Sequence, residues 1–231
     1  MFETAISSNN DNIIADAMSA WIVGDGRIKT PGSYVDYLSK RMRENTPFSP
    51  RLRQQSIRVI ERDRAREERV MVELGAGPLL NRLDVGVDEI EDKGRWVVLL
   101  RHVVRLLKNP EDLSPHYWHL LDKLVSGGSF GEPFVSEEVK VLEFLTEKKE
   151  WEKLELWVVI GWQTLPEPNR YRSTSSAAKD VEKATRELLL QRPSALPRLE
   201  HLRKTRGADE WAYKDALQAV CDEAKANHPS P

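Results

Sequence analysis

The chain has 231 residues, of which 40% are hydrophobic and 31% charged, and its formal net charge is −2. A chain of this length can form one large domain or two small ones, and it can bury a core without disulfides or structural metals. The near-neutral charge excludes strong bulk attraction to nucleic acid or to an anionic membrane. Because so many residues are charged, the apolar ones must be concentrated in stripes.

The cysteine content and the apolar runs bear on where the protein resides. Cys221 is the only cysteine, so no intramolecular disulfide can form, which favours a reducing compartment. The N-terminal stretch lacks the basic and apolar regions of a signal peptide. The longest strongly apolar run, residues 156–162, is far too short to cross a bilayer. We therefore expect a protein that is not secreted, lies in the cytoplasm or nucleus, and does not insert into membranes.

Capping residues and prolines mark helix starts through the N-terminal part of the chain. The predicted starts are Asn10 or Asp11, Thr30-Pro31 and Ser49-Pro50. Proline suits the first helical position because its missing N–H costs no hydrogen bond there. The third helix is predicted to run to about residue 74, and two weaker elements follow at 78–83 and 87–92.

The strongest helical pattern covers residues 95–165, where five of the seven tryptophans fall. Its apolar residues recur at helical spacing, and the segment 149–165 is apolar nearly all round, as expected for a central helix. The side chains predicted to be buried here are those of Trp96, Leu100, Val104, Trp118, Leu121, Leu142, Trp157 and Ile160.

Polar residues and glycines set the details of these central helices. In the helix predicted over 95–108, three basic residues at i, i+4 and i+7 indicate a stripe that faces water. These residues are Arg101, Arg105 and Lys108. The next helix begins at Ser114-Pro115 and ends at Gly127-Gly128, and Ser136 is predicted to cap the one after it.

The C-terminal part begins with the longest polar, turn-rich stretch, residues 166–176, which we interpret as a linker or long loop. Helices are predicted after it, over 177–191, 194–204 and 209–225. The resulting domain prediction is a main helical domain over 1–165, the linker at 166–176, and C-terminal helices over 177–231 that pack on the main domain. One continuous domain remains an alternative.

The fold class that follows is all-α, built of antiparallel helical hairpins, because no alternating run is long enough for a strand. The predicted helix pairs begin near residues 11, 50, 95, 136 and 175. A spacing of roughly 40 residues is the period of HEAT and armadillo hairpins. No residue signature recurs between the pairs, however, and short-looped helices pair at this period in any antiparallel bundle. A HEAT- or armadillo-like right-handed stack and an irregular helical bundle both remain open.

His116 and His119, which share one helix face with Asp122, are the candidate metal ligands of the sequence. Two imidazoles at i, i+3 and a carboxylate can bind zinc. Lys123 shares that face, however, and an ammonium beside a cation site is unfavourable. We interpret the histidines as part of an exposed polar face and predict no metal site and no cofactor.

The sequence contains no catalytic motif in the context that its chemistry requires. Ser129 lies in a G-x-S-x-G sequence, residues 127–131, but no predicted strand precedes it, as a nucleophile elbow requires. Neither glycine-rich stretch, 75–77 or 127–131, has phosphate-loop spacing. Cys221 lies on the apolar face of the last predicted helix, which indicates a buried, inert thiol. We therefore predict no catalytic residues and no enzyme activity; an enzyme whose site is assembled from distant residues is the third alternative.

An arginine-rich segment covers residues 51–69. The arginines singled out as a candidate interaction surface are Arg58, Arg62, Arg64, Arg66 and Arg69. Acidic residues are interleaved with them, and pairs such as Arg64 with Glu68 can form at i, i+4. This pattern is typical of a solvated helix face or an arm, and the alternative is a surface that contacts nucleic acid.

Two tryptophans complete the candidate surface. Trp151 and Trp211 lie nearer the edges of their apolar stripes than the other tryptophans do, so they are candidates for an exposed protein-binding surface. The sequence as a whole favours a non-catalytic, all-helical protein-interaction or scaffold module with a protein partner. A nucleic-acid-associated protein that uses the 51–69 helix is the alternative.

Overall fold

The secondary structure is helical wherever it is defined. The computed structural model describes residues 2–23, 37, 40–41, 43–44, 47–62, 80, 84–107, 110, 113–128, 132–166, 176–205 and 211–227. These ranges contain no strand, which confirms the all-α prediction. No helix within them is long and apolar enough to cross a membrane. The chain divides into two compact units, Met1–Ser129 and Phe130–Pro231, which we describe separately.

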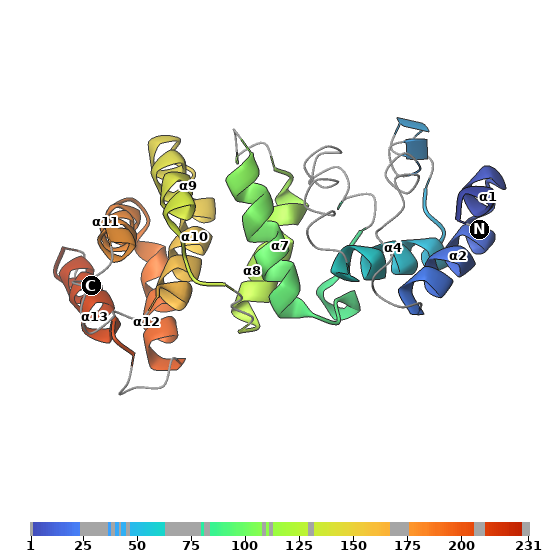
Figure 1. Cartoon of the computed structure of the whole chain (residues 1–231). Helices are drawn as coiled ribbons and strands as arrows, with labels where there is room; N and C mark the ends of the chain where they lie inside the picture. Colours follow the sequence, from blue (N-terminus) through green and yellow to red (C-terminus); the bar gives the residue numbers. More distant parts are fainter. Residues whose placement is uncertain are drawn as a thin grey trace. The chain divides into compact units, whose positions relative to one another are not determined.

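The first unit is built of helices where it is described (Figure 1). They are α1 (Phe2–Ser7), α2 (Asp11–Val23), α4 (Pro50–Arg62), the 3-10 helix η1 (Val87–Glu89), α7 (Lys93–Leu106) and α8 (Pro115–Ser126). Of these, α2, α4 and α8 begin at predicted capping signals. The Asn10 side chain accepts a hydrogen bond from the Asn12 N–H at 3.0 Å. The Ser114 hydroxyl accepts a hydrogen bond from the Tyr117 N–H at 3.3 Å, and Pro115 occupies the first turn of α8. Each side chain satisfies a backbone donor that the first turn would otherwise leave without a partner.

Two helix pairs form the core of the first unit. In the first pair, α2 packs against α4, and Ile14 and Leu52 are fully buried. In the second, α7 packs against α8, and the Tyr117 hydroxyl donates a hydrogen bond to the backbone oxygen of Leu100. Desolvation raises the pKa of Tyr117 well above its ordinary value, so the phenol is neutral.

The prediction of a basic stripe facing water on α7 is wrong at Arg101. Its side chain is only 2% exposed. Arg101 lies on the same side of the helix as Val97 and Val104, which are both buried, because i, i+4 and i+7 share a face. Arg105 is half-buried, and Lys108 lies outside the described residues. Polar spacing alone did not reveal that the long aliphatic stem of an arginine can be packed into a core.

The second unit is a cluster of helices (Figure 1). Its elements are α9 (Ser136–Glu147), α10 (Trp151–Thr164), α11 (Ser176–Gln191), the 3-10 helix η3 (Pro193–Ala195), α12 (Leu196–Thr205) and α13 (Lys214–Asn227). α9, α10, α13 and η3 all pack against α11, and α9 and α10 also pack against each other. α13 packs against α12 as well, and η3 joins α11 to α12.

Three predicted helix starts in this unit are corrected. The helix predicted over 209–225 begins at Lys214, since residues 211–213 are not helical. Ser136 is the first residue of α9 and not its cap; Val135 is the cap, and its N–H donates to the Glu138 carboxylate at 2.9 Å. The helix predicted from Lys149 begins at Trp151, because Lys149 adopts a φ of 59°. This left-handed conformation ends one helix and reverses the chain before the next, and it cannot be continued as a helix.

The apolar core matches the sequence prediction closely. All eight side chains predicted to be buried are at most 7% exposed. The Trp157 indole also donates a hydrogen bond to the Glu138 backbone oxygen at 3.2 Å, which ties α10 to the start of α9. Of the predicted linker, residues 167–175 lie outside the described ranges, and its role as a domain boundary stays a prediction. The helices on either side of it, α10 and α11, pack against each other within the second unit.

Candidate functional site

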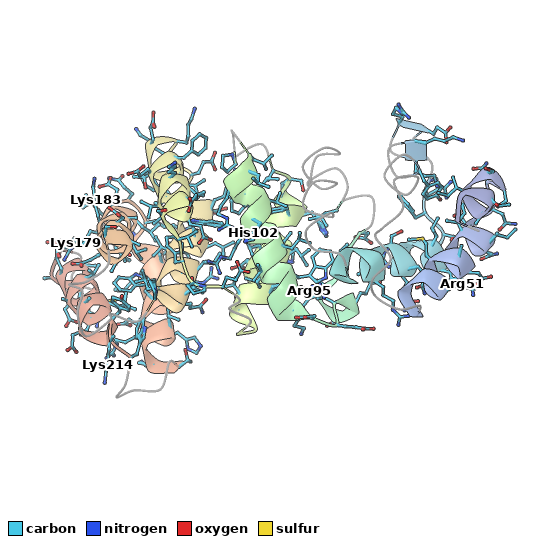
Figure 2. The ribbon with its side chains drawn as sticks, in the orientation of Figure 1. Arg51, Arg95, His102, Lys179, Lys183 and Lys214 are labelled. Atoms are coloured by element: carbon cyan, nitrogen blue, oxygen red, sulfur yellow. The ribbon has the colours of Figure 1, made fainter. Side chains whose placement is uncertain are left out.

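The candidate site is the outer side of α11, which is built on a strongly amphipathic helix. Its inner face buries Ala177, Val181 and Leu188 against the rest of the unit, whereas Lys179 and Lys183 are exposed. Figure 2 shows both lysines on the side of α11 that is turned away from α10. Grooves lie along both flanks of this helix, one beside α9 and the other beside α13.

The α9–α11 groove is a cavity of about 300 Å³. Its lining residues are Val139, Leu142, Glu143, Thr146, Glu147, Asp180, Lys183, Ala184 and Glu187. Its floor is apolar, with Leu142 and Ala184 buried and Val139 half-buried. The Thr146 hydroxyl donates a hydrogen bond to the Leu142 backbone oxygen at 2.8 Å. Since its hydroxyl is satisfied within α9, Thr146 can contribute its methyl group to the apolar floor. The charged residues form the rim above this floor.

The α11–α13 groove is a cavity of about 370 Å³ on the other flank of α11. Its lining residues are Lys183, Arg186, Glu187, Leu189, Leu190, Val220, Glu223, Ala224 and Asn227. Arg186 bridges the two helices, since its guanidinium lies 2.7 Å from Glu182 and 2.9 Å from Glu223. The hydrogen bond that Arg186 donates to Glu223, followed by the one it donates to Glu182, raises the pKa of Arg186, so this bridge is fully charged. Leu190, at the edge of this groove, is 56% exposed.

Lys183 and Glu187 line both grooves. They lie one turn apart on α11 and form the ridge between the two hollows. The two grooves are therefore parts of one continuous surface. Sequence reasoning missed this surface, because the polar face of α11 has the same spacing as any solvated helix face. Only the packing of α9 and α13 along its flanks distinguishes it.

The arginines singled out from the sequence are only partly described. Arg58 pairs with Glu91 at 3.4 Å. Only the backbone of Arg62 is described, as the last residue of α4, while Arg64, Arg66 and Arg69 lie outside the described residues. The preceding arginines are also paired, Arg51 with Asp16 and Arg53 with Glu89. Where the segment is described, its guanidinium groups thus face carboxylates of the same unit.

The two candidate tryptophans lie apart from the grooves. Trp151 begins α10 and is half-buried. Trp211 is also half-buried, and its ring packs edge-on against Trp162 with the ring centroids 6.2 Å apart. Tyr213 packs against the same indole, at 6.4 Å, and its hydroxyl donates to the Pro166 backbone oxygen at 2.7 Å. Trp211 therefore contributes to the packing around Trp162, and neither candidate tryptophan lines either groove.

The two histidines of α8 border a third cavity, of about 360 Å³, in the first unit. His119 is exposed and His116 is half-buried, and Arg53 and Glu89 line the same cavity. The Arg53 guanidinium binds the Glu89 carboxylate through its two terminal nitrogens, at 2.5 and 2.6 Å. Burial would raise the pKa of Glu89, but the hydrogen bond from the Gly86 N–H, followed by Arg53, outweighs it and lowers this pKa. No group of three or more His, Cys, Asp or Glu side chains in the described ranges is arranged to hold a metal ion.

Comparisons with protein-family models, with curated proteins and with solved structures find no match to this chain. We therefore infer function from the surface of α11 alone.

Proposed function

We propose that this protein is a non-catalytic, all-helical protein-interaction or scaffold module whose partner binds the outer side of α11. The observation that carries the proposal is the pair of grooves that flank this helix and share Lys183 and Glu187. Apolar floors with charged rims, and a leucine exposed at the edge, are the composition of a protein-binding patch. The partner is another protein, bound in the cytoplasm or nucleus.

The module is proposed to be built of antiparallel helical hairpins. α9 and α10, joined by a short turn around Lys149, are one such hairpin. Whether successive hairpins stack as in HEAT and armadillo proteins or form an irregular bundle changes the overall curvature, but not the local grooves. Both versions place a partner against the exposed sides of helices.

Nucleic-acid binding receives no support from the described part of the arginine-rich segment. Arg51, Arg53 and Arg58 each lie beside a carboxylate, so a phosphate would have to displace an acidic partner. A salt titration of RNA and DNA binding tests this alternative directly. A steep loss of affinity with salt would favour it over the protein-interaction proposal.

Site-specific photo-crosslinking tests the proposed function. A photoreactive amino acid replaces Lys183, on the ridge between the grooves, and in a control protein it replaces Lys140, an exposed residue of α9 that lines neither groove. We expect defined protein adducts from position 183 only. The adducts should disappear when Leu190→Arg is added, because Leu190 lines the α11–α13 groove and is exposed enough to be replaced without unfolding. Equal adducts at both positions, or adducts that ignore Leu190→Arg, would overturn the proposal.

A further inference from the structure

The rim of the α9–α11 groove carries a strong excess of negative charge. Glu143 and Glu147 extend from α9, and Asp180 and Glu187 from α11, against the single ammonium of Lys183. Four carboxylates and one ammonium give a formal net charge of −3 around a cavity of about 300 Å³. The whole chain, by contrast, carries only −2. The groove is therefore a local concentration of negative charge on a nearly neutral protein.

Within the described part of the second unit, these rim carboxylates form no salt bridge. Most of the other described acidic residues of the unit do form salt bridges. The pairs are Glu150–Lys153, Glu152–Arg192, Glu155–Arg192, Glu155–Arg198, Glu182–Arg186, Glu223–Arg186, Glu200–Lys225 and Asp222–Lys225. Among the described residues, no salt bridge involves Glu143, Glu147, Asp180 or Glu187.

The two α9 carboxylates of the rim lie close to each other. Glu143 lies one turn before Glu147, and like charges at i, i+4 repel each other. Lys148 and Lys149 follow Glu147 at the end of α9, but neither of them lines the groove. A cation bound in the groove would relieve the repulsion between the two carboxylates.

We propose that the α9–α11 groove binds a basic amphipathic helix of a partner protein. This inference rests on the proposed function and specifies the chemistry of the partner. The apolar stripe of the partner helix would cover Val139, Leu142 and Ala184, and lysines or arginines on both sides of that stripe would face the rim carboxylates. The groove extends along α9 from Val139 to Glu147, which is about 12 Å at the rise of an α-helix, so two turns of a partner helix fit along it.

A second copy of this chain is a poorer occupant. Its most basic described helices are α4 and α7, and the apolar faces of both are already covered: Leu52 and Ile57 of α4, and Leu100 and Val104 of α7, are at most 1% exposed. Arg51, Arg53 and Arg58 of α4 are paired with carboxylates of their own unit. A partner from another protein therefore fits the groove better than α4 does.

Binding of designed peptides to the full chain tests the inference. The probe is a fluorescent amphipathic helix of about 15 residues, near the length at which an isolated helix begins to form. It carries a leucine and alanine stripe flanked by lysines at i, i+4. The comparison peptides are a scrambled peptide of identical composition and an amphipathic helix with glutamates in place of the lysines. We expect binding of the basic helix alone, measured by fluorescence anisotropy, and weaker binding at high salt because exposed charge pairs are screened.

Variants of the chain locate the binding. Glu143→Lys with Glu147→Lys should weaken binding about tenfold at low salt, because each reversal replaces attraction with repulsion. The matched control, Asp88→Lys with Asp215→Lys, makes the same change in net charge at exposed residues outside the groove and should leave the affinity unchanged. Val139→Gln keeps the rim charges and removes apolar floor, so it should weaken binding of the basic helix. Thermal melting verifies that each variant is folded.

Each other outcome has a defined meaning. Equal binding of the scrambled peptide, or equal loss of affinity in the Asp88 and Asp215 control, would show non-specific attraction and overturn the inference. If the glutamate peptide binds as tightly and Val139→Gln weakens it, the acidic rim does not select the partner, and the inference fails while the proposed function stands. Binding of no peptide overturns the inference too, and the crosslinking at Lys183 then decides the proposed function. If the chain self-associates and the Glu143→Lys, Glu147→Lys variant does not, the occupant of the groove is a second copy of this chain, and the inference of a different partner protein fails.

Discussion

The indole N–H of Trp162 donates a hydrogen bond to the hydroxyl oxygen of Thr185 at 2.8 Å, and both groups are buried. The same hydroxyl donates to the Val181 backbone oxygen at 2.6 Å. One threonine side chain therefore joins α10 to α11 and satisfies the only polar atom of a buried tryptophan. Buried polar groups require such partners, because an unpaired donor loses its hydration without compensation.

Thr185→Val should lower the free energy of unfolding by about 1–3 kcal/mol, because it leaves the Trp162 N–H buried without an acceptor. Chemical denaturation monitored by tryptophan fluorescence measures the change. Thr185→Ser keeps the hydroxyl and should lose less. The two changes Thr185→Val and Trp162→Phe should be less than additive when combined; strict additivity would show that the hydrogen bond contributes nothing to stability.

Gly161→Ala should destabilise the second unit even though alanine is the better helix former. A Cβ at position 161 would lie 2.9 Å from Val181 Cγ2 and 3.2 Å from Val181 Cγ1, where α10 and α11 approach each other. Overpacking of this kind costs about 1–3 kcal/mol, more than the ~1 kcal/mol gained in helix propensity. Gly94→Ala is the matched control: its Cβ has no contact closer than 3.7 Å, so it should stabilise the chain. If Gly161→Ala melts at a higher temperature than Gly94→Ala, α10 and α11 do not approach each other closely at Gly161.

Lys149→Gly should raise the free energy of unfolding by up to about 1 kcal/mol. Lys149 has a φ of 59° in the turn between α9 and α10, and a left-handed conformation strains any residue with a Cβ. Its neighbour Lys148 has an ordinary helical conformation, with a φ of −77°. Lys148→Gly should therefore destabilise the protein instead, since glycine there only increases the entropy of the unfolded chain. Urea denaturation distinguishes the two signs.

Trp157→Ala should lower the free energy of unfolding by about 3–5 kcal/mol, the range for truncation of a buried aromatic side chain. Trp157 is fully buried, and its indole donates to the Glu138 backbone oxygen. Calorimetry measures the loss, and Trp157→Phe retains most of the ring volume and should cost less. A thermal midpoint unchanged by Trp157→Ala would contradict the role of α10 in the core.

Cys221 should make the protein less stable at alkaline pH. Burial, followed by the nearby Glu200 carboxylate, raises the pKa of its thiol to about 11. A free thiol has a pKa of about 8.5. Between these values the folded state retains a proton that the unfolded state releases, so stability is fully present at lower pH and falls as the pH rises toward 11. Stability measured from pH 8 to 11 for the wild type and for Cys221→Ala should diverge over this range, with the wild type falling more steeply.

The apolar core could be predicted from the sequence because a helix repeats its buried positions every three to four residues, whatever it packs against. This is why Trp96, Leu121 and Trp157 were assigned correctly. Helix starts could also be predicted where a side chain caps the first turn, as those of Asn10 and Ser114 do, because a cap and its backbone donor are only two or three residues apart. These features depend on residues within one or two turns of each other.

The features that the sequence did not reveal depend on distant parts of the chain or on one backbone angle. The burial of Arg101 depends on how α7 is packed, and the start of α10 depends on the φ of Lys149. The grooves are the clearest case. Glu143 and Asp180 lie on the same rim only because α9 and α11 pack together, and nothing in either segment alone indicates the other.

The central position of α11 has a consequence for the thermodynamics of recognition. This helix packs against α9, α10, α13 and η3, so the walls of both grooves are ordered when the unit folds. A partner therefore meets a pre-organised template, and the protein loses little conformational entropy on association. If the partner segment is unstructured before it binds, the ordering entropy falls almost entirely on the partner's side. Helix-forming substitutions in the partner would then strengthen the complex more effectively than any stabilising change in this chain.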